Sequence, residues 1–174
     1  MSVPRAMNFY VYEGGAFFQH QCANVFLRLG CRQVEEPRLA AVAIAPLLRR
    51  RLSREEYGAP REGTLVFHPS ALPYRRGPDA IRQAIAAGER VSASTWFWCD
   101  DGFDTGPICE QELVVLQPGQ APKDAYVERF VPAALRALER AAEGILWRSP
   151  RRVPQEDSLA TYDTWLRKER PPAA

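Results

Sequence analysis

The 174-residue sequence has few of the side chains from which metal sites and disulfide frameworks are built. It contains two histidines and no C-x-x-C pair, so we expect neither a zinc site nor any other metal site. Free thiols in a reducing compartment are expected, which places the protein in the cytoplasm. The four cysteines are Cys22, Cys31, Cys99 and Cys109.

The sequence also lacks long apolar runs and an excess of charge of one sign. No stretch approaches the roughly 20 apolar residues that cross a bilayer, and the N-terminal MSVPRAM has no apolar signal core. The formal net charge is +2 with scattered arginines, which argues against nucleic acid and membrane partners. With 46% hydrophobic residues, residues 1–174 are expected to form a single domain.

The apolar residues that are present alternate between strand and helix patterns. A proline inside the last helical pattern, Pro132, predicts a kink or a late start. The tail from about residue 147 is expected to be partly irregular, with a last helical turn near 161–169. Strands are predicted at 7–12, 39–46, 63–67, 92–98 and 108–116, and helices at 16–29, 53–58, 78–88 and 122–145.

This order predicts an α/β fold with a mostly parallel sheet and helices on its faces. The opening strand, glycine turn and helix are typical of a Rossmann-like unit, although the full G-x-G-x-x-G is absent. In such sheets ligands bind beyond the carboxyl ends of the strands. Two polar stretches follow predicted strands, FHPSALPYRRG at 67–77 and CDDGFDTGP at 99–107, and we expect them to meet at one site.

The first stretch begins at the end of a strand with His68, and the second contains Asp104. Side chains alternate along a strand, so Val66 should share a face with His68. Asp100 and Asp101 are typical of turn chemistry, whereas Asp104 could orient a histidine. A histidine and a carboxylate beside an apolar pocket could perform general acid–base catalysis. A structural histidine and an ordinary acidic turn remain open alternatives.

The two stretches together resemble the folate-dependent formyltransferase family. VFHPSALPYRRG and DDGFDTGPICEQ are similar to its His-Pro-Ser and Asp-Thr-Gly loops, in the same order. The resemblance extends from about Ala41 to Lys168 and includes RVPQ and ATYD near the end. It implies a Rossmann-like formyltransferase fold, here in a trimmed form because only CRQVEEPR stands where the family has a further strand–helix–strand segment.

The resemblance also implies a co-substrate and site residues. The co-substrate would be 10-formyltetrahydrofolate, without a metal, and the catalytic residues would be His68 and Asp104. The family's catalytic asparagine corresponds to Val66, which removes one donor to the formyl oxygen. The 10-formyltetrahydrofolate dehydrogenase branch also has an aliphatic residue there. The implied folate-binding residues are Ala45, Pro46, Leu47, Leu48, Ser70, Leu72, Asp100, Asp101 and Gly102.

Three functions remain open at this point. The first is transfer of the formyl group to the amine of a small molecule, and the second is hydrolysis that releases formate. The third is a folate-binding remnant without catalysis. We expect neither tRNA nor glycinamide ribonucleotide as the acceptor. The family's C-terminal tRNA-holding domain is not expected here, and YEGGAFFQ lacks the Gly-Ser-Asn phosphate loop of the purine-pathway enzyme. Trp96 and Trp98 are expected in the core, although a homodimer contact is also consistent with a trimmed sheet.

Overall fold

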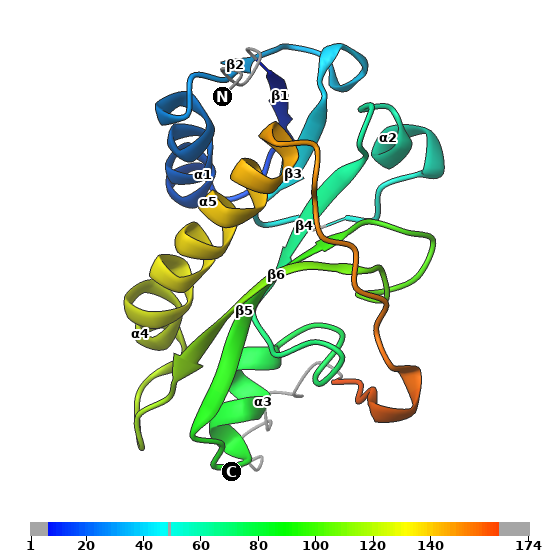
Figure 1. Ribbon diagram of the computed structural model, residues 1–174. Helices are drawn as coiled ribbons and strands as arrows, with labels where there is room; N and C mark the ends of the chain where they lie inside the picture. The colour runs from blue at the N-terminus through cyan, green and yellow to red at the C-terminus, as the bar shows by residue number, and fades with distance from the viewer. Residues whose placement is uncertain (1–6, 49, 164–174) are drawn as a thin grey trace, which may run out of the picture.

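A computed structural model describes residues 7–48 and 50–163 and shows one six-stranded sheet in the order β2-β1-β3-β4-β5-β6 (Figure 1). The first four strands along the chain are parallel, β5 is antiparallel to β4, and β6 is antiparallel to β5. The prediction of a mostly parallel α/β sheet is therefore confirmed. The strands are β1 (Asn8–Val11), β2 (Arg32–Gln33), β3 (Val42–Ala45), β4 (Thr64–His68), β5 (Val91–Trp98) and β6 (Ile108–Val115).

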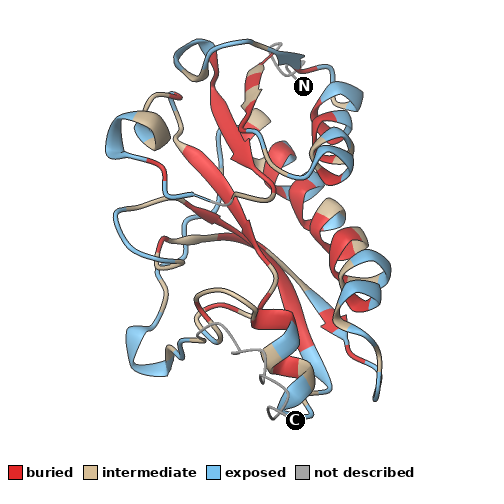
Figure 2. Ribbon diagram, turned by 180° about the vertical axis from the view of Figure 1, so that it is seen from behind, coloured by how far each residue is buried: buried red, intermediate tan, exposed pale blue. Residues whose placement is uncertain are grey.

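Two long helices, α1 (Ala16–Arg28) and α5 (Val131–Leu146), cover one face of the sheet, and Figure 2 shows buried residues along their inner sides. The main core lies between these helices and the strands, and it includes Trp96 and Trp98 as predicted. The shorter helices are α2 (Arg54–Gly58), α3 (Ala80–Ala86) and α4 (Pro122–Ala125). No helix in residues 7–48 or 50–163 is long and apolar enough to cross a membrane.

Strand β4 divides its side chains between the two faces of the sheet, as the alternation predicted. Leu65 and Phe67 belong to the main core under α1 and α5, whereas Val66 belongs to a second apolar cluster on the opposite face. This second cluster is centred on Tyr12, Ala43, Ala45, Leu52, Val66, Leu72 and Phe97. His68 follows Val66 by two residues, so its side chain leaves the strand on the same face.

Two local sequence signals have visible structural effects. Ser53 caps α2, a helix that the sequence predicted at 53–58, and forms a reciprocal capping box with Glu56. Pro132 has no N–H to donate to the carbonyl one turn earlier. The chain accordingly widens into a π-helical turn at Tyr126–Phe130, in which the Val131 amide bonds to the Tyr126 carbonyl, and α5 begins at Val131.

The end of the described chain, residues 147–163, is a long irregular strap that the sequence only partly predicted. It starts after α5, and Figure 1 shows it in orange, passing beside the sheet. The Trp98 indole donates to the Arg151 carbonyl, and Val153 forms an antiparallel bridge with Ile108 of β6. The helical turn predicted near 161–169 is wrong for its first residues, since Tyr162 forms a bridge with Arg76. Its remainder, residues 164–169, lies outside the described residues.

The segment 31–38, for which the sequence predicts no strand or helix, contributes the edge strand β2 and the start of a short 3₁₀ turn at Pro37–Leu39. Both residues of β2, Arg32 and Gln33, are exposed. A strand of two exposed polar residues has no apolar alternation, so no pattern could reveal it.

Candidate functional site

His68 lies at the carboxyl end of β4 with only 7% of its surface exposed. Its Nε2 is 2.7 Å from the Arg75 carbonyl oxygen. A carbonyl oxygen only accepts hydrogen bonds, so Nε2 must carry the hydrogen. The other ring nitrogen, Nδ1, therefore provides the position at which a proton can be taken up or released, and it is 3.6 Å from Oδ2 of Asp104.

Asp104 reaches His68 by a route different from the one that the sequence suggested. Strand β5 runs antiparallel to β4, and its last residue, Trp98, pairs with Leu65 near the start of β4. The loop 99–107 therefore begins at the opposite end of β4 and must return along the sheet to reach His68. The expectation that the two stretches meet is confirmed. The two stretches do not leave the same edge of the sheet, contrary to the expectation from the sequence, because the carboxyl ends of strands share one edge only when the strands are parallel, and β4 and β5 are antiparallel.

The carboxylate of Asp104 is held by the main chain of the first stretch. The Gly77 amide donates to Oδ2 of Asp104 at 2.8 Å, and Asp104 itself has a left-handed backbone with φ 55°. Few residues other than glycine adopt this conformation, although aspartate tolerates it. The loop geometry thus points this carboxylate toward His68, while Asp100 and Asp101 point elsewhere.

Three of the predicted folate-binding residues meet in the second apolar cluster. Ala45 and Leu72 are buried there beside Val66, and Leu48 packs against them while remaining partly exposed. Tyr12 is in the same cluster, and its hydroxyl donates to the Glu56 carbonyl. Burial, reinforced by Glu56, raises the Tyr12 pKa to about 12, so this phenol stays neutral. The cluster is thus a buried apolar layer on the sheet face from which His68 leaves β4, and Leu48 is among the partly exposed residues at its edge.

The predicted polar folate-binding residues already have partners within the protein. The Ser70 hydroxyl donates to the Tyr74 carbonyl, and Asp100 accepts from the Gly102 amide and the Thr105 hydroxyl. Asp101 instead bonds to α2, where it accepts from Arg54 and from the Tyr57 hydroxyl at 2.9 Å. These acids therefore shape and tether the loop 99–107.

The loop after β3, with Pro46 and Leu47, passes over the glycine pair that follows β1. A Cβ atom added to Gly14 would overlap the Leu47 carbonyl oxygen, so only glycine permits this approach. Pro46 is buried and Leu47 is partly exposed. The predicted folate loop is thus packed closely against the start of α1.

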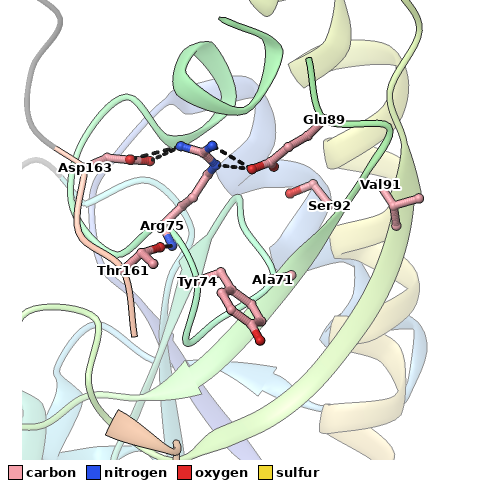
Figure 3. Close-up of a pocket in the computed structure, with 8 residues that line it drawn as sticks. All are labelled: Ala71, Tyr74, Arg75, Glu89, Val91, Ser92, Thr161 and Asp163. Atoms are coloured by element: carbon pink, nitrogen blue, oxygen red, sulfur yellow. Dashed lines mark hydrogen bonds and ion pairs between the residues drawn. The ribbon is translucent and has the colours of Figure 1, made fainter. Parts of the chain in front are cut away.

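A separate cavity of about 410 Å³ lies beside the first stretch (Figure 3). Figure 3 shows the Arg75 guanidinium between the carboxylates of Glu89 and Asp163, and both ion pairs are at hydrogen-bonding distance. Ala71, which stands between the predicted folate-binding residues Ser70 and Leu72, is among the described residues that line the cavity. The lining is Ala71, Tyr74, Arg75, Glu89, Val91, Ser92, Thr161 and Asp163.

Sequence reasoning did not assign roles to Arg76 and Gln155, which connect the strap to the loop of Asp104. Gln155 donates to the carbonyls of Asp104 and Gly106, and it accepts from the Arg76 guanidinium. Gln155 belongs to the RVPQ segment that resembles the family, and this resemblance was the signal in the sequence that could have identified it. That resemblance did not indicate which atoms it would contact.

The fold and this geometry define an α/β protein with a histidine–carboxylate pair on the sheet face that carries the second apolar cluster. The formyl transferase family profile matches residues 33–141, which include both His68 and Asp104. The chain therefore belongs to the formyl transferase family, and the resemblance stated from the sequence is confirmed.

Individual relatives agree with this assignment. The chain is 32% identical over 131 residues to mitochondrial 10-formyltetrahydrofolate dehydrogenase from Homo sapiens, covering 75% of this chain and 14% of that protein. It is 37% identical over 121 residues to methionyl-tRNA formyltransferase from Carboxydothermus hydrogenoformans, covering 68% of this chain and 38% of that protein. The chain thus spans only a part of each of these relatives.

Solved structures show the same fold. A variant of HypX from Aquifex aeolicus superposes with a TM-score of 0.77 at 17% identity, over 92% of this chain and 30% of that one. HypX has also been crystallised with tetrahydrofolic acid, with a TM-score of 0.69 to this chain at 19% identity, over 90% of this chain and 29% of that one. At these identities the similarity establishes the fold.

Proposed function

We propose that this chain transfers the formyl group of 10-formyltetrahydrofolate to the amine of a small molecule, with assistance from His68 and Asp104. The observation that carries the proposal is the placement of His68 Nδ1 beside Asp104 Oδ2, on the sheet face that also carries Val66 and its apolar cluster. Membership of the formyl transferase family and the tetrahydrofolate complex of a protein with the same fold support a folate co-substrate.

In the proposed reaction the acceptor amine attacks the formyl carbon and forms a tetrahedral oxyanion. The new C–N bond forms, the bond between the formyl carbon and N10 of the folate breaks, and tetrahydrofolate leaves with a proton on N10. The amine loses one proton and N10 gains one, so a group that exchanges protons is needed. Nδ1 of His68 is suited to this role because Nε2 is engaged by the Arg75 carbonyl. Asp104 would hold the ring in the orientation that this proton exchange requires.

The apolar cluster would bind the flat pterin ring. Leu48 would contact the ring, with the buried Ala45 and Leu72 packed behind it, and the backbone of the loop through Pro46 and Leu47 has polar groups for the pterin edge. The tethered loop 100–104 would close this site from the other side. Holding the two reactants together here would supply a large part of the rate.

Hydrolysis is the second candidate, because the aliphatic Val66 is shared with the 10-formyltetrahydrofolate dehydrogenase branch that the sequence resembles. Water would replace the amine, the C–N10 bond would break, and formate, tetrahydrofolate and a proton would be released. Val66 stands where the family has an asparagine, so one donor to the oxyanion is missing, and such a donor contributes about 2.7–4 kcal/mol. The two 10-formyltetrahydrofolate reactions differ only in the attacking group, so the same His68–Asp104 pair would serve both.

The test follows the fate of the formyl carbon. The chain is incubated with 10-[¹³C]formyltetrahydrofolate, with and without a panel of small amines, and products are identified by NMR. Label in an N-formyl amine supports transfer, whereas label in formate regardless of amine supports hydrolysis. Label that stays on the folate contradicts both and favours a non-catalytic remnant. His20→Ala, an exposed histidine on α1, is the control for His68→Ala.

A further inference from the structure

We infer that Gln155 is a positioning residue that holds Asp104 against His68, and that Arg76 fixes the orientation of the Gln155 amide. Gln155 lies on the strap, and its Nε2 donates to the carbonyl of Asp104 at 2.9 Å and to the carbonyl of Gly106 at 2.8 Å. One amide thus spans the backbone on both sides of Thr105. The inference rests on the proposed function, because it assigns Asp104 a part in the reaction.

Arg76 determines which end of the Gln155 amide faces the loop. The guanidinium donates to Gln155 Oε1 from Nε at 3.1 Å and from Nη2 at 2.9 Å. A guanidinium can only donate, so the amide oxygen must face Arg76 and the NH₂ group must face the two carbonyls. Arg76 is only 1% exposed and is also bonded to Asp157 and to the Tyr162 hydroxyl, which fixes its own position.

The residue after Arg76 holds the other end of Asp104. The Gly77 amide donates to the side-chain oxygen Oδ2, while Arg76, through Gln155, holds the main-chain carbonyl. Two consecutive residues of the histidine loop therefore fix both the backbone and the carboxylate of Asp104. These two attachments hold Asp104 in its left-handed backbone conformation, which is energetically unfavourable for a residue other than glycine.

The attachment of the strap itself does not depend on Gln155. The bond from the Trp98 indole to the Arg151 carbonyl, the bridge between Val153 and Ile108, and the bridge between Tyr162 and Arg76 hold the strap on either side of Gln155. Since these contacts remain when Gln155 is changed, the effect of a substitution should fall on the loop of Asp104 rather than on the fold.

The test compares Gln155→Leu and Gln155→Glu with Glu156→Gln. Leucine removes the amide at similar volume, and glutamate keeps an oxygen for Arg76 but lacks the NH₂ donors. Glu156 is the matched control, because it is the adjacent residue and its side chain accepts only from Ser158 among the described contacts. Hydrogen exchange of the Gly77 amide, followed by NMR, reports the bond to Asp104 Oδ2 without requiring activity.

We expect Gly77 exchange to be at least tenfold faster in both Gln155 variants and unchanged in Glu156→Gln. The kcat for 10-formyltetrahydrofolate should fall tenfold to hundredfold, because small displacements of catalytic groups have effects of that size. In an Asp104→Asn background, Gln155→Leu should change kcat less than twofold, whereas a merely structural role would lower it equally in both backgrounds.

Unchanged Gly77 exchange in a folded Gln155 variant overturns the inference, and so does an undiminished effect of Gln155→Leu in the Asp104→Asn background. If Gln155→Leu does not fold, Gln155→Glu decides. If the unmodified chain does not turn over 10-formyltetrahydrofolate, the proposed function fails, while Gly77 exchange still decides whether Gln155 holds Asp104.

Discussion

The glycine pair after β1 provides a sharp prediction, because Gly14 lies directly under the predicted folate loop. A Cβ at this position would overlap the Leu47 carbonyl oxygen, which is a backbone atom and cannot rotate away. The loop through Pro46 and Leu47 must therefore move in Gly14→Ala. Overpacking of this kind costs about 1–3 kcal/mol of stability. For a chain of this length, that corresponds to a loss of roughly 2–12 °C in Tm.

Gly58→Ala is the matched control, since a Cβ there has no atom within 4 Å and the residue ends α2. We expect it to be neutral or slightly stabilising. Tm is measured by circular dichroism, and the Kd for tetrahydrofolate by calorimetry. In Gly14→Ala the Kd should rise at least about tenfold, equivalent to about 1.4 kcal/mol. Equal Tm for the two variants would refute the packing argument, and an unchanged Kd with a lowered Tm would refute the placement of folate at this loop.

Three further predictions concern Val66, Glu56 and Cys99. Val66→Asn should raise kcat/KM for amine formylation up to about 100-fold, because the amide would donate to the oxyanion. Burying this amide should cost about 1–3 kcal/mol of stability. Unchanged kinetics in the folded variant would contradict a role for residue 66 in oxyanion stabilisation. Arg50, with the Ser53 amide, lowers the Glu56 pKa to about 2. The unmodified chain should therefore have a higher free energy of unfolding than Glu56→Gln above pH 4.5, the usual pKa, and this difference should disappear as the pH falls toward 2. Urea unfolding at several pH values measures it, and a difference independent of pH would contradict the prediction. Burial, then Asp100, raises the Cys99 pKa to about 11, so iodoacetamide at pH 8 should alkylate it more than tenfold more slowly than an unfolded-state thiol, and mass spectrometry showing equal rates would refute it.

The sequence predicted the elements whose patterns are local. The helices predicted at 16–29 and 53–58 and the alternation along β4 are each determined by residues close in the chain, and the structure confirms them. The meeting of His68 and Asp104 was also predicted, although for a reason that holds only for parallel strands. The direction of β5 depends on its pairing with β4, and no local pattern distinguishes parallel from antiparallel pairing in a strand that is buried on both faces.

The strap shows a different limit of sequence reasoning. Residues 147–163 contain arginines, prolines and acids without periodicity, so the segment resembles a solvated tail. Its order comes from long-range contacts of single side chains, such as Gln155 with Asp104 and Arg76 with Tyr162. Such contacts connect residues more than 50 positions apart, and the sequence contains no signal for their geometry.

The central claim is that the His68–Asp104 pair acts on 10-formyltetrahydrofolate, and it is tested most directly by following tetrahydrofolate formation by absorbance. The assay compares the unmodified chain, His68→Ala and His20→Ala, each with and without an amine acceptor. The account predicts turnover by the unmodified chain and by His20→Ala, and its loss in His68→Ala. Turnover that persists in His68→Ala, or that is absent from the unmodified chain with every acceptor tried, would contradict the account.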